Sequence, residues 1–267
     1  MNVVIPIKQV PETSKVRMDP VTGTMIREGV ESIVNPLDLY AIEVGVQLAG
    51  QTGGKATAIS MGPPKAGEAL REAVSMGCDG GILLSHRDFA GSDTWATSYA
   101  LARAIAKVGG WDVVVCGERA TDGDTAQVGP GIAAWLDVPV GTYISGIVEH
   151  RPKSLVVRRL VEDGYETLEI ELPCLLTVVK EVASPRMPTL RGKQKARKME
   201  IPVWGPVEIE ADPGSLGLRG SPTRVVKVES PKVTRHGDIR VPRDPADMER
   251  AVDDLVAYLE KHDLLPR

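Results

Sequence analysis

Short apolar runs alternate with longer segments of helical periodicity over roughly the first 115 residues of this chain. The apolar runs, which are expected to form buried strands, are residues 3–7, 56–61, 81–84 and 113–116. The periodic segments, which are expected to form helices, start at Pro36 and cover residues 66–76 and 94–108. Strands that alternate with helices favour a mostly parallel sheet covered on both faces. We therefore predict an α/β fold built on an open, Rossmann-like sheet.

Asn35 and Pro36 mark the start of the first expected helix. Proline is favoured in the first helical turn and asparagine is a preferred N-cap, so Asn35 is expected to cap this helix. Upstream, the turn sequence from Asp19 to Gly23 lies between two short extended segments. It predicts a small hairpin within residues 16–26.

The pattern changes after about residue 140. Residues 144–149, 155–162, 166–172 and 174–179 alternate apolar and polar side chains, with no helical segment between them. These segments predict antiparallel strands, with Asp163 and Gly164 forming a hairpin turn. The sheet is therefore expected to carry an added antiparallel segment.

The C-terminal part of the chain is rich in proline and glycine. Residues 203–242 show little periodicity and cannot bury much by themselves, so we expect an extended arm that packs on another surface. A final helix is predicted over residues 244–262, where one stripe is formed by Met248, Val252, Leu255 and Leu259. The predicted organisation is an α/β domain over residues 1–200, followed by an arm and a helix over residues 201–267.

Composition excludes several classes of protein. The net charge of −4, the isoelectric point near 5.7 and the aromatic content of 4% argue against nucleic-acid binding. No segment approaches the ~20 apolar residues of a membrane span, and the N-terminus begins in a strand pattern, so we expect a soluble, cytoplasmic protein. Cys78, Cys116 and Cys174 show no metal-ligand spacing, and neither do the four histidines. We expect reduced, buried thiols and surface histidines.

A polar loop rich in glycine, aspartate and threonine follows the fourth expected strand. It runs from Gly117 to Val128 and includes Thr121, Asp122, Gly123, Asp124, Thr125, Ala126 and Gln127. Open α/β sheets bind ligands at the carboxyl ends of their strands, where backbone N–H groups and helix N-termini hold phosphate. The loop therefore predicts a nucleotide site, although such sequences also form plain turns.

Several residues of this loop are assigned separate roles. The expected phosphate donors are the backbone N–H groups from Gly123 to Ala126, the Thr125 hydroxyl and the Gln127 side chain. The carboxylates of Asp122 and Asp124 repel phosphate, so Asp122 is expected to reach a ribose hydroxyl or to cap the next helix. Pro130 lacks a backbone N–H, and the helix therefore begins late unless Pro130 lies in its first turn.

A distinctive order of segments occupies residues 158–177: a basic strand, an acidic turn, an apolar strand, a proline and an apolar run. The sequence is Arg-Arg-Leu-Val-Glu-Asp-Gly-Tyr-Glu-Thr-Leu-Glu-Ile-Glu-Leu-Pro-Cys-Leu-Leu-Thr. With this spacing, the chain resembles the β subunits of electron transfer flavoproteins over residues 1–200. The resemblance includes Lys8, Asn35-Pro36, residues 61–63, the loop at residues 122–130 and Thr189-Leu190. It implies an adenine-nucleotide α-hydrolase-like sheet with the antiparallel segment and the extended C-terminal arm added.

The resemblance also implies a partner and a nucleotide. Members of this family form a heterodimer with an α subunit that carries FAD, and they pass electrons from dehydrogenases to an acceptor. The C-terminal arm, which has little core of its own, is expected to pack on that α subunit. The implied nucleotide contacts are Pro6 at the adenine edge, Asn35 at the base or ribose, Met61 on the adenine ring, and the loop from Gly117 to Val128.

The nucleotide itself is a choice between AMP and FAD. Family members that hold structural AMP have a loop like Asp-Asp-Asp followed by a polar residue and Gln-Thr-Gly-Gln. Electron-bifurcating members, in which a second FAD accepts electrons from NADH, have Asp-Gly-Asp-Thr-Ala-Gln-Val-Gly-Pro, which stands at residues 122–130. We therefore expect FAD, with electrons passing through the α-subunit FAD to an acyl-CoA dehydrogenase or reductase and to ferredoxin or flavodoxin. A carrier with AMP, or a stand-alone ATP-binding stress-type protein, remains an alternative.

Residues 184–198 resemble the loop by which β subunits dock onto acyl-CoA dehydrogenases. Leu190 lies at the apolar anchor position, and Lys193, Lys195 and Arg197 follow it as contacts for an acidic partner. An apolar anchor ringed by charges is a common design for a binding hot spot. The alternative interpretation is a solvated basic linker.

Overall fold

The computed structural model describes residues 1–12, 17–18, 25–26, 32–224, 226, 237 and 239–264. The chain divides into two compact units, Met1–Val228 and Glu229–Arg267. The first unit contains an α/β fold, and the described residues of the second contain a single helix.

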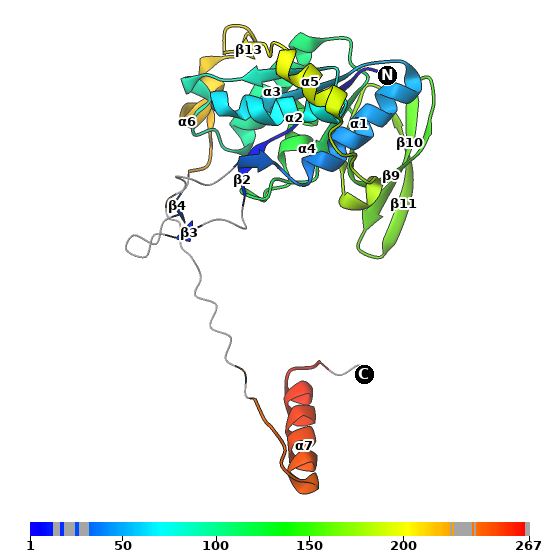
Figure 1. Ribbon diagram of the computed structural model, residues 1–267, viewed down its shortest axis with the longest axis vertical. Helices are drawn as coiled ribbons and strands as arrows, with labels where there is room; N and C mark the ends of the chain where they lie inside the picture. The colour runs from blue at the N-terminus through cyan, green and yellow to red at the C-terminus, as the bar shows by residue number, and fades with distance from the viewer. Residues whose placement is uncertain are drawn as a thin grey trace. The chain divides into compact units, whose positions relative to one another are not determined.

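A nine-stranded sheet runs through the first unit (Figure 1). From one edge to the other, its strands are β11 (Gly164–Glu171), β10 (Ser154–Val161), β9 (Val140–His150), β12 (Cys174–Val178), β8 (Val113–Gly117), β1 (Val3–Pro6), β6 (Ala56–Met61), β7 (Gly80–Leu84) and β13 (Val203–Trp204). All neighbouring strands from β9 to β13 pair in parallel, while β10 and β11 extend the sheet antiparallel. The predicted mostly parallel sheet with an antiparallel segment is confirmed.

Helices cover both faces of the parallel part of this sheet. One face packs against α1 (Asp38–Thr52), α2 (Gly67–Met76) and α5 (Leu190–Lys198), and the other packs against α3 (Thr94–Val108) and α4 (Val128–Leu136). Successive side chains of a strand point to opposite faces, so Val3 enters one apolar cluster and Val4 the other. Burial on both faces explains why the strand sequences are continuously apolar.

Strand β12 runs in a different direction from the one predicted. It pairs in parallel with β8, where Cys174 lies opposite Val113, and also in parallel with β9. The predicted antiparallel arrangement of this strand is therefore wrong. Side-chain alternation has a period of two in either direction, so it predicts a strand without predicting which way its neighbours run.

The start of the first helix and the turn of the β10–β11 hairpin both differ from the prediction by one or two residues. Helix α1 begins at Asp38, whose N–H donates to the main-chain carbonyl of Asn35 at 2.9 Å, and the Asn35 side chain does not cap the helix. The predicted N-cap role of Asn35 is wrong. In the β10–β11 hairpin Val161 pairs with Gly164, so the turn residues are Glu162 and Asp163 rather than Asp163 and Gly164.

The N-terminal region adds two short antiparallel pairs to the fold. Strand β2 (Gln9–Pro11) pairs with β5 (Ser32–Val34), and β3 (Arg17–Met18) pairs with β4 (Met25–Ile26). The β3–β4 pair agrees with the predicted hairpin, whose turn at residues 19–23 lies outside the described residues.

The first compact unit continues well beyond residue 200, where the sequence predicts its end. Strand β13 adds to the sheet beside β7, and the side chains of Ile209 and Leu216 are buried against α3 and its neighbours. The Arg103 guanidinium also donates to the main-chain carbonyl of Ile209 at 3.2 Å. Residues 203–223 therefore belong to the α/β body, because the apolar residues among their prolines and glycines pack on it.

The second unit contains α7 (Pro245–Lys261), which begins where the sequence predicts. Asp244 caps it by accepting the Asp247 N–H at 2.8 Å, and Pro245 occupies the first turn. None of its residues is buried within the unit, and its apolar residues Met248, Val252 and Leu255 are exposed.

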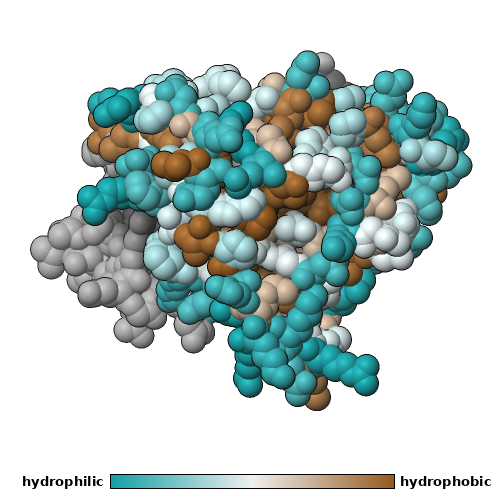
Figure 2. Space-filling view, turned by 90° about the horizontal axis from the view of Figure 1, so that it is seen from above, coloured by the Kyte–Doolittle hydropathy of each residue, from teal (hydrophilic) through white to brown (hydrophobic). Residues whose placement is uncertain are grey.

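The surface of the described residues is mixed in character. On the face seen in Figure 2, exposed apolar residues lie in several separate patches among polar ones. Within the described residues, no helix is both long enough and apolar enough to cross a membrane.

Candidate functional site

A large cavity lies at the carboxyl ends of the central strands. Chain order takes the sheet from β1 through β6 to β7 on one side, and then to β8 on the other side of β1. Such a reversal leaves a crevice between the two strands, and open α/β sheets bind ligands there. The cavity has a volume of about 970 Å³ and includes Pro6 at the end of β1 and Gly117 at the end of β8.

The structure brings most of the predicted site residues together around this cavity. Those that line it are Pro6, Met61, Gly117, Gly123, Asp124, Thr125, Ala126 and Val128. Those that do not line it are Asn35, Thr121, Asp122 and Gln127. The predicted nucleotide contacts of both groups stay predictions.

The loop before α4 has an unusual backbone. Asp124 and Ala126 both have positive φ values, 54° and 56°, which non-glycine residues seldom adopt. Such alternation turns successive N–H groups toward one concave side, as in anion-binding nests. Within the described residues, the N–H groups of Gly123, Thr125 and Ala126 have no hydrogen-bond partner, whereas that of Asp124 donates to the Ala120 carbonyl at 2.9 Å. Asp124 therefore leaves the predicted set of phosphate donors, and the other three N–H groups remain in it.

Ion pairs hold the acidic residues of the loop. Lys8 Nζ lies 2.7 Å from Asp122 Oδ1, and Arg119 lies 3.2 Å from carboxylate oxygens of both Glu118 and Asp124. Asp122 does not cap α4, because that helix begins at Val128 without a side-chain cap. The loop carboxylates thus neutralise the neighbouring cations.

A buried pair, Asn35 and Asp38, fastens the loop to the sheet. The Asn35 amide donates to Asp38 Oδ1 and to the Arg119 carbonyl, both at 2.9 Å, and its oxygen accepts the Thr121 N–H at 3.2 Å. Asp38 Oδ2 accepts the Lys8 N–H at 2.7 Å. Asn35 is fully buried, so it positions the loop from behind.

Burial gives Asp38 an unusual pKa. Desolvation raises the pKa of this carboxyl to about 7, although the hydrogen bonds from Lys8 and Asn35 and the Lys8 charge oppose the shift. Asp38 lines the cavity, and a Cβ on Gly117 would lie only 2.4 Å from its Oδ1. Glycine is therefore required at the end of β8 for the loop to pass this close to the carboxyl.

Helix α4 also makes a close approach to the sheet. A Cβ on Gly129 would lie 2.6 Å from the Thr177 side chain, so glycine lets the first turn contact β12. Pro130 occupies the third position of the helix, where its missing N–H would have no helical partner. The helix therefore begins at Val128 in spite of Pro130.

Sequence reasoning missed the opposite wall of the cavity. This wall is formed by residues 85–94 after β7, with His86, Arg87, Phe89, Asp93 and Thr94 among its members, and by Thr97 and Thr223. A polar loop after a parallel strand is the signal that could have identified it, because the same signal identified the loop after β8.

The predicted docking segment contains a helix. Residues 190–198 form α5, which Thr189 caps by accepting the Gly192 N–H at 2.9 Å. Lys195 Nζ donates to the Cys78 carbonyl at 3.1 Å, and Ala196 is buried. This part of the segment is thus a helix rather than a loop, and it packs on the body through Ala196. Leu190 is 83% exposed at its first turn, which leaves the predicted anchor accessible.

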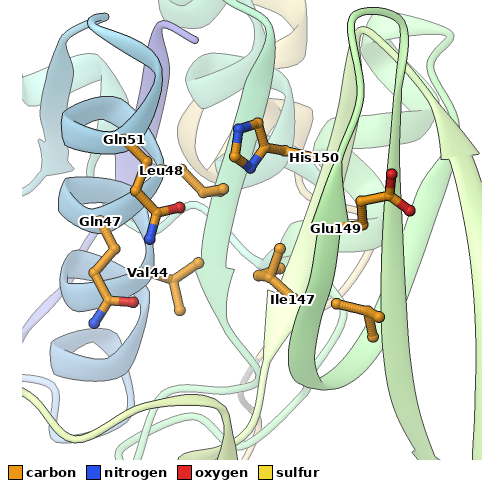
Figure 3. Close-up of a pocket in the computed structure, with 8 residues that line it drawn as sticks. Val44, Gln47, Leu48, Gln51, Ile147, Glu149 and His150 are labelled. Atoms are coloured by element: carbon orange, nitrogen blue, oxygen red, sulfur yellow. The ribbon is translucent and has the colours of Figure 1, made fainter.

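A second, smaller cavity of about 220 Å³ lies between α1 and β9 (Figure 3). Val44, Gln47, Leu48 and Gln51 reach it from α1, and Ile147, Glu149 and His150 reach it from β9. It contains no predicted site residue, and the Glu149 carboxylate is already paired with Arg151 at 2.8 Å. The larger cavity is therefore the candidate site.

The three cysteines and the described histidines take the structural places predicted for them, while His236 lies outside the described residues. Cys78, Cys116 and Cys174 are free and buried, and burial raises the pKa of all three thiols, to about 12 for Cys78 and Cys174. His86, His150 and His262 are exposed. No group of three or more potential metal ligands occurs within the described residues.

A mostly parallel sheet with a large cavity at its switch point defines an α/β protein of the ligand-binding, doubly wound class. The electron transfer flavoprotein domain family matches residues 22–208. The chain belongs to the electron transfer flavoproteins and is similar to their β subunits.

Three relatives illustrate the similarity. The electron transfer flavoprotein subunit beta of Thermoanaerobacterium thermosaccharolyticum is 47% identical over 266 residues, which cover 99% of this chain and 100% of the relative. Subunit CarD of the caffeyl-CoA reductase–Etf complex of Acetobacterium woodii is 46% identical over 240 residues, covering 90% of this chain and 91% of the relative. Protein FixA of Sinorhizobium fredii is 42% identical over 270 residues, covering 98% and 94%.

Proposed function

We propose that this chain is the β subunit of a heterodimeric electron transfer flavoprotein of the bifurcating type. In this proposal its cavity binds FAD, which accepts electrons from NADH. The electrons then pass in two directions: through the FAD of an α subunit to an acyl-CoA dehydrogenase or reductase, and to a low-potential acceptor such as ferredoxin or flavodoxin.

The observation that carries the choice of FAD over AMP is the extent of the cavity. It runs from the loop after β8 to residues 85–94 after β7, and its volume of about 970 Å³ is near the upper end of the usual range for ligand pockets, about 300–1,000 Å³. A mononucleotide held by the β8 loop alone would leave the far wall without a ligand. A dinucleotide gives both walls a role.

The residues around the cavity fit the parts of a flavin dinucleotide. The unpartnered N–H groups of Gly123, Thr125 and Ala126 are donors for a phosphate, and Met61 is an apolar side chain suited to an aromatic ring. Apart from its chain neighbours, no atom of the described residues would lie within 4 Å of a Cβ on Gly123, so this glycine leaves space for a ligand. When bound, the flavin supplies the two-electron chemistry, and the chain supplies its position and surroundings.

Similarity to CarD supports an acyl-CoA reductase as the kind of partner. The name of that relative places it in a complex with caffeyl-CoA reductase. In the present chain, Leu190 and Met187 are 83% and 82% exposed beside the basic residues of α5. We propose this surface as the docking site for the acyl-CoA enzyme.

The C-terminal unit supports an α subunit as the permanent partner. Helix α7 presents Met248, Val252 and Leu255 on one stripe, and none of its residues is buried within its own unit. An amphipathic helix of this kind is stabilised by packing its apolar face on another surface. We propose that the α subunit provides that surface.

An anaerobic titration of the purified heterodimer with NADH tests the proposed function. The proposal predicts that NADH bleaches the flavin absorbance without any added dehydrogenase, because the FAD of this chain accepts the electrons directly. A control with the dehydrogenase and its acyl-CoA substrate reports whether the α-subunit flavin is intact. Bleaching in the control alone would contradict the proposal and favour the carrier with AMP.

A further inference from the structure

The wall of the cavity formed by residues 85–94 is held in place by its own contacts. Phe89 is buried in the apolar cluster that contains Leu216, and Ser92 Oγ donates to the Phe89 carbonyl at 2.8 Å. Asp93 accepts the Ala96 N–H at 3.0 Å and the Thr223 hydroxyl at 2.7 Å. A side chain projecting from this segment is therefore carried on a fixed support, which is what a binding residue requires.

Arg87 is a cation of this wall that has no partner among the described residues. Of the cationic residues around the cavity, Lys8 is paired with Asp122, Arg119 with two carboxylates, and His86 lies 3.3 Å from Asp88. Within the described residues, the exposed Arg87 side chain has neither a hydrogen bond nor an ion pair. An exposed guanidinium on the wall of a ligand cavity is free to bind an anion that a ligand brings.

The opposite wall does not supply a cation for such an anion. The loop after β8 carries three carboxylates, from Glu118, Asp122 and Asp124, which already take up Lys8 and Arg119. Its backbone N–H groups can hold one phosphate, but a diphosphate carries about two negative charges and would lie close to these carboxylates. The wall after β7, which carries Arg87, is therefore the better place for the second phosphate.

We propose that Arg87 binds the diphosphate of a dinucleotide in this cavity. A guanidinium suits this role because its planar N–H groups bind two phosphate oxygens at once, whereas a lysine offers a point charge. The inference rests on the proposed function in assuming a dinucleotide. FAD and NADH share this diphosphate, and the experiment separates them.

Binding of AMP and ADP to the nucleotide-depleted heterodimer tests the inference without using flavin chemistry. Wild type is expected to bind ADP roughly 10- to 100-fold more tightly than AMP, because Arg87 recognises the second phosphate. Arg87→Gln is expected to lose this preference while retaining its affinity for AMP, and Arg87→Lys is expected to keep part of it. The control Arg219→Gln removes an exposed cation from α6 (Gly217–Gly220) that does not line the cavity, and is expected to behave as wild type.

Two further measurements identify the source of the diphosphate and separate this inference from the proposed function. If Arg87 holds FAD, Arg87→Gln purifies with about one flavin fewer per heterodimer than wild type. If it holds NADH, the variant keeps its flavins and its KM for NADH rises roughly 10- to 100-fold. An unchanged preference for ADP in Arg87→Gln overturns the inference. A wild type that contains AMP and still prefers ADP overturns only the proposed function.

Discussion

At the scale of single residues, the buried Asn35–Asp38 pair decides how the nucleotide loop is held. Asn35 uses both its amide and its oxygen on residues 119 and 121, and Asp38 accepts the N–H of Lys8, which follows β1. The pair thus joins the first strand, the first helix and the loop after β8. A substitution at either residue should therefore alter the position of the loop at the cavity, although neither residue lies in the loop.

Asp38 is expected to make stability depend on pH between 3.8 and about 7. Its pKa is about 7 in the folded chain, against 3.8 for an ordinary aspartate, so the folded chain binds more protons than the unfolded chain between these values. The free energy of unfolding should therefore fall as pH rises through this window, by up to ~1.4 kcal/mol per pH unit from this group. Urea titrations of Asp38→Asn at a series of pH values should lack this contribution.

A matched variant separates Asp38 from the general charge of the protein. Asp163→Asn removes an exposed carboxylate from the β10–β11 turn and should leave the pH dependence as in wild type. If the free energy of unfolding depends on pH equally in wild type and in Asp38→Asn, Asp38 is ionised over the whole pH range measured. That result would contradict our account of its burial.

The sequence allowed prediction of the loop residues but not of the residues behind them. Gly117 to Val128 could be found because a glycine-rich loop after an apolar strand has a known use. The asparagine before Pro36 was interpreted as a cap, because N-caps are frequent and its contacts with residues 119 and 121 span more than eighty positions. Long-range hydrogen bonds of this kind leave no local pattern.

At the scale of elements, one ion pair fixes the segment that leads into α5. Arg186 donates to Glu43 of α1 through Nε at 2.8 Å and through its terminal nitrogen at 2.9 Å, and its backbone N–H adds a third bond at 3.0 Å. Glu43 is 3% exposed. The Arg186 side-chain hydrogen bonds hold the pKa of Glu43 at about 2. The predicted docking segment is therefore anchored to the body just before its exposed leucine.

Removing the guanidinium should loosen this segment. Arg186→Ala leaves a buried carboxylate with fewer partners and is expected to cost about 2 kcal/mol near neutral pH, a value reduced for the partial exposure of Arg186. Because the pKa of Glu43 is lowered, the contribution is present above about 4.5 and is lost as pH falls towards 2. Urea unfolding near pH 7 measures the loss.

The double variant Glu43→Gln with Arg186→Ala serves as the control for this ion pair. It removes the buried charge as well, so it should recover part of the stability lost in Arg186→Ala. If the losses of stability in Arg186→Ala and Glu43→Gln simply add up in the double variant, the two side chains are not coupled. The assignment of this ion pair as an anchor would then be wrong.

Leu190 tests whether α5 docks a partner. Its side chain is 83% exposed, so Leu190→Ala should change the free energy of unfolding by less than ~0.5 kcal/mol. If it is a hot spot, kcat/KM for electron transfer with the acyl-CoA enzyme should fall by about tenfold or more. Val207→Ala, at another exposed position, is the control. A rate unchanged in Leu190→Ala would remove the docking assignment.

Elements were predicted more reliably than their arrangement. Strand β6 and helix α3 begin and end where the sequence places them, because their periodicity and capping are local. The direction of β12 and the packing of residues 203–223 depend on contacts with strands and helices that are distant in the sequence, so no local pattern predicts them. Ile209 and Leu216 are too widely spaced to show a periodic pattern, yet each is buried.

At the scale of the whole molecule, the strand order of the sheet explains why two separate loops line the same cavity. The reversal of strand order at β1 places the loops after β7 and β8 around the same crevice. Family membership follows from the match over residues 22–208, and the choice of nucleotide is the step that we propose beyond it.

The nucleotide content of the purified heterodimer tests that step most directly. Release of the bound nucleotides by denaturation, followed by chromatographic quantification of FAD and AMP against protein, gives the ratio. Our account predicts two FAD and no AMP per heterodimer. One FAD and one AMP per heterodimer would contradict it.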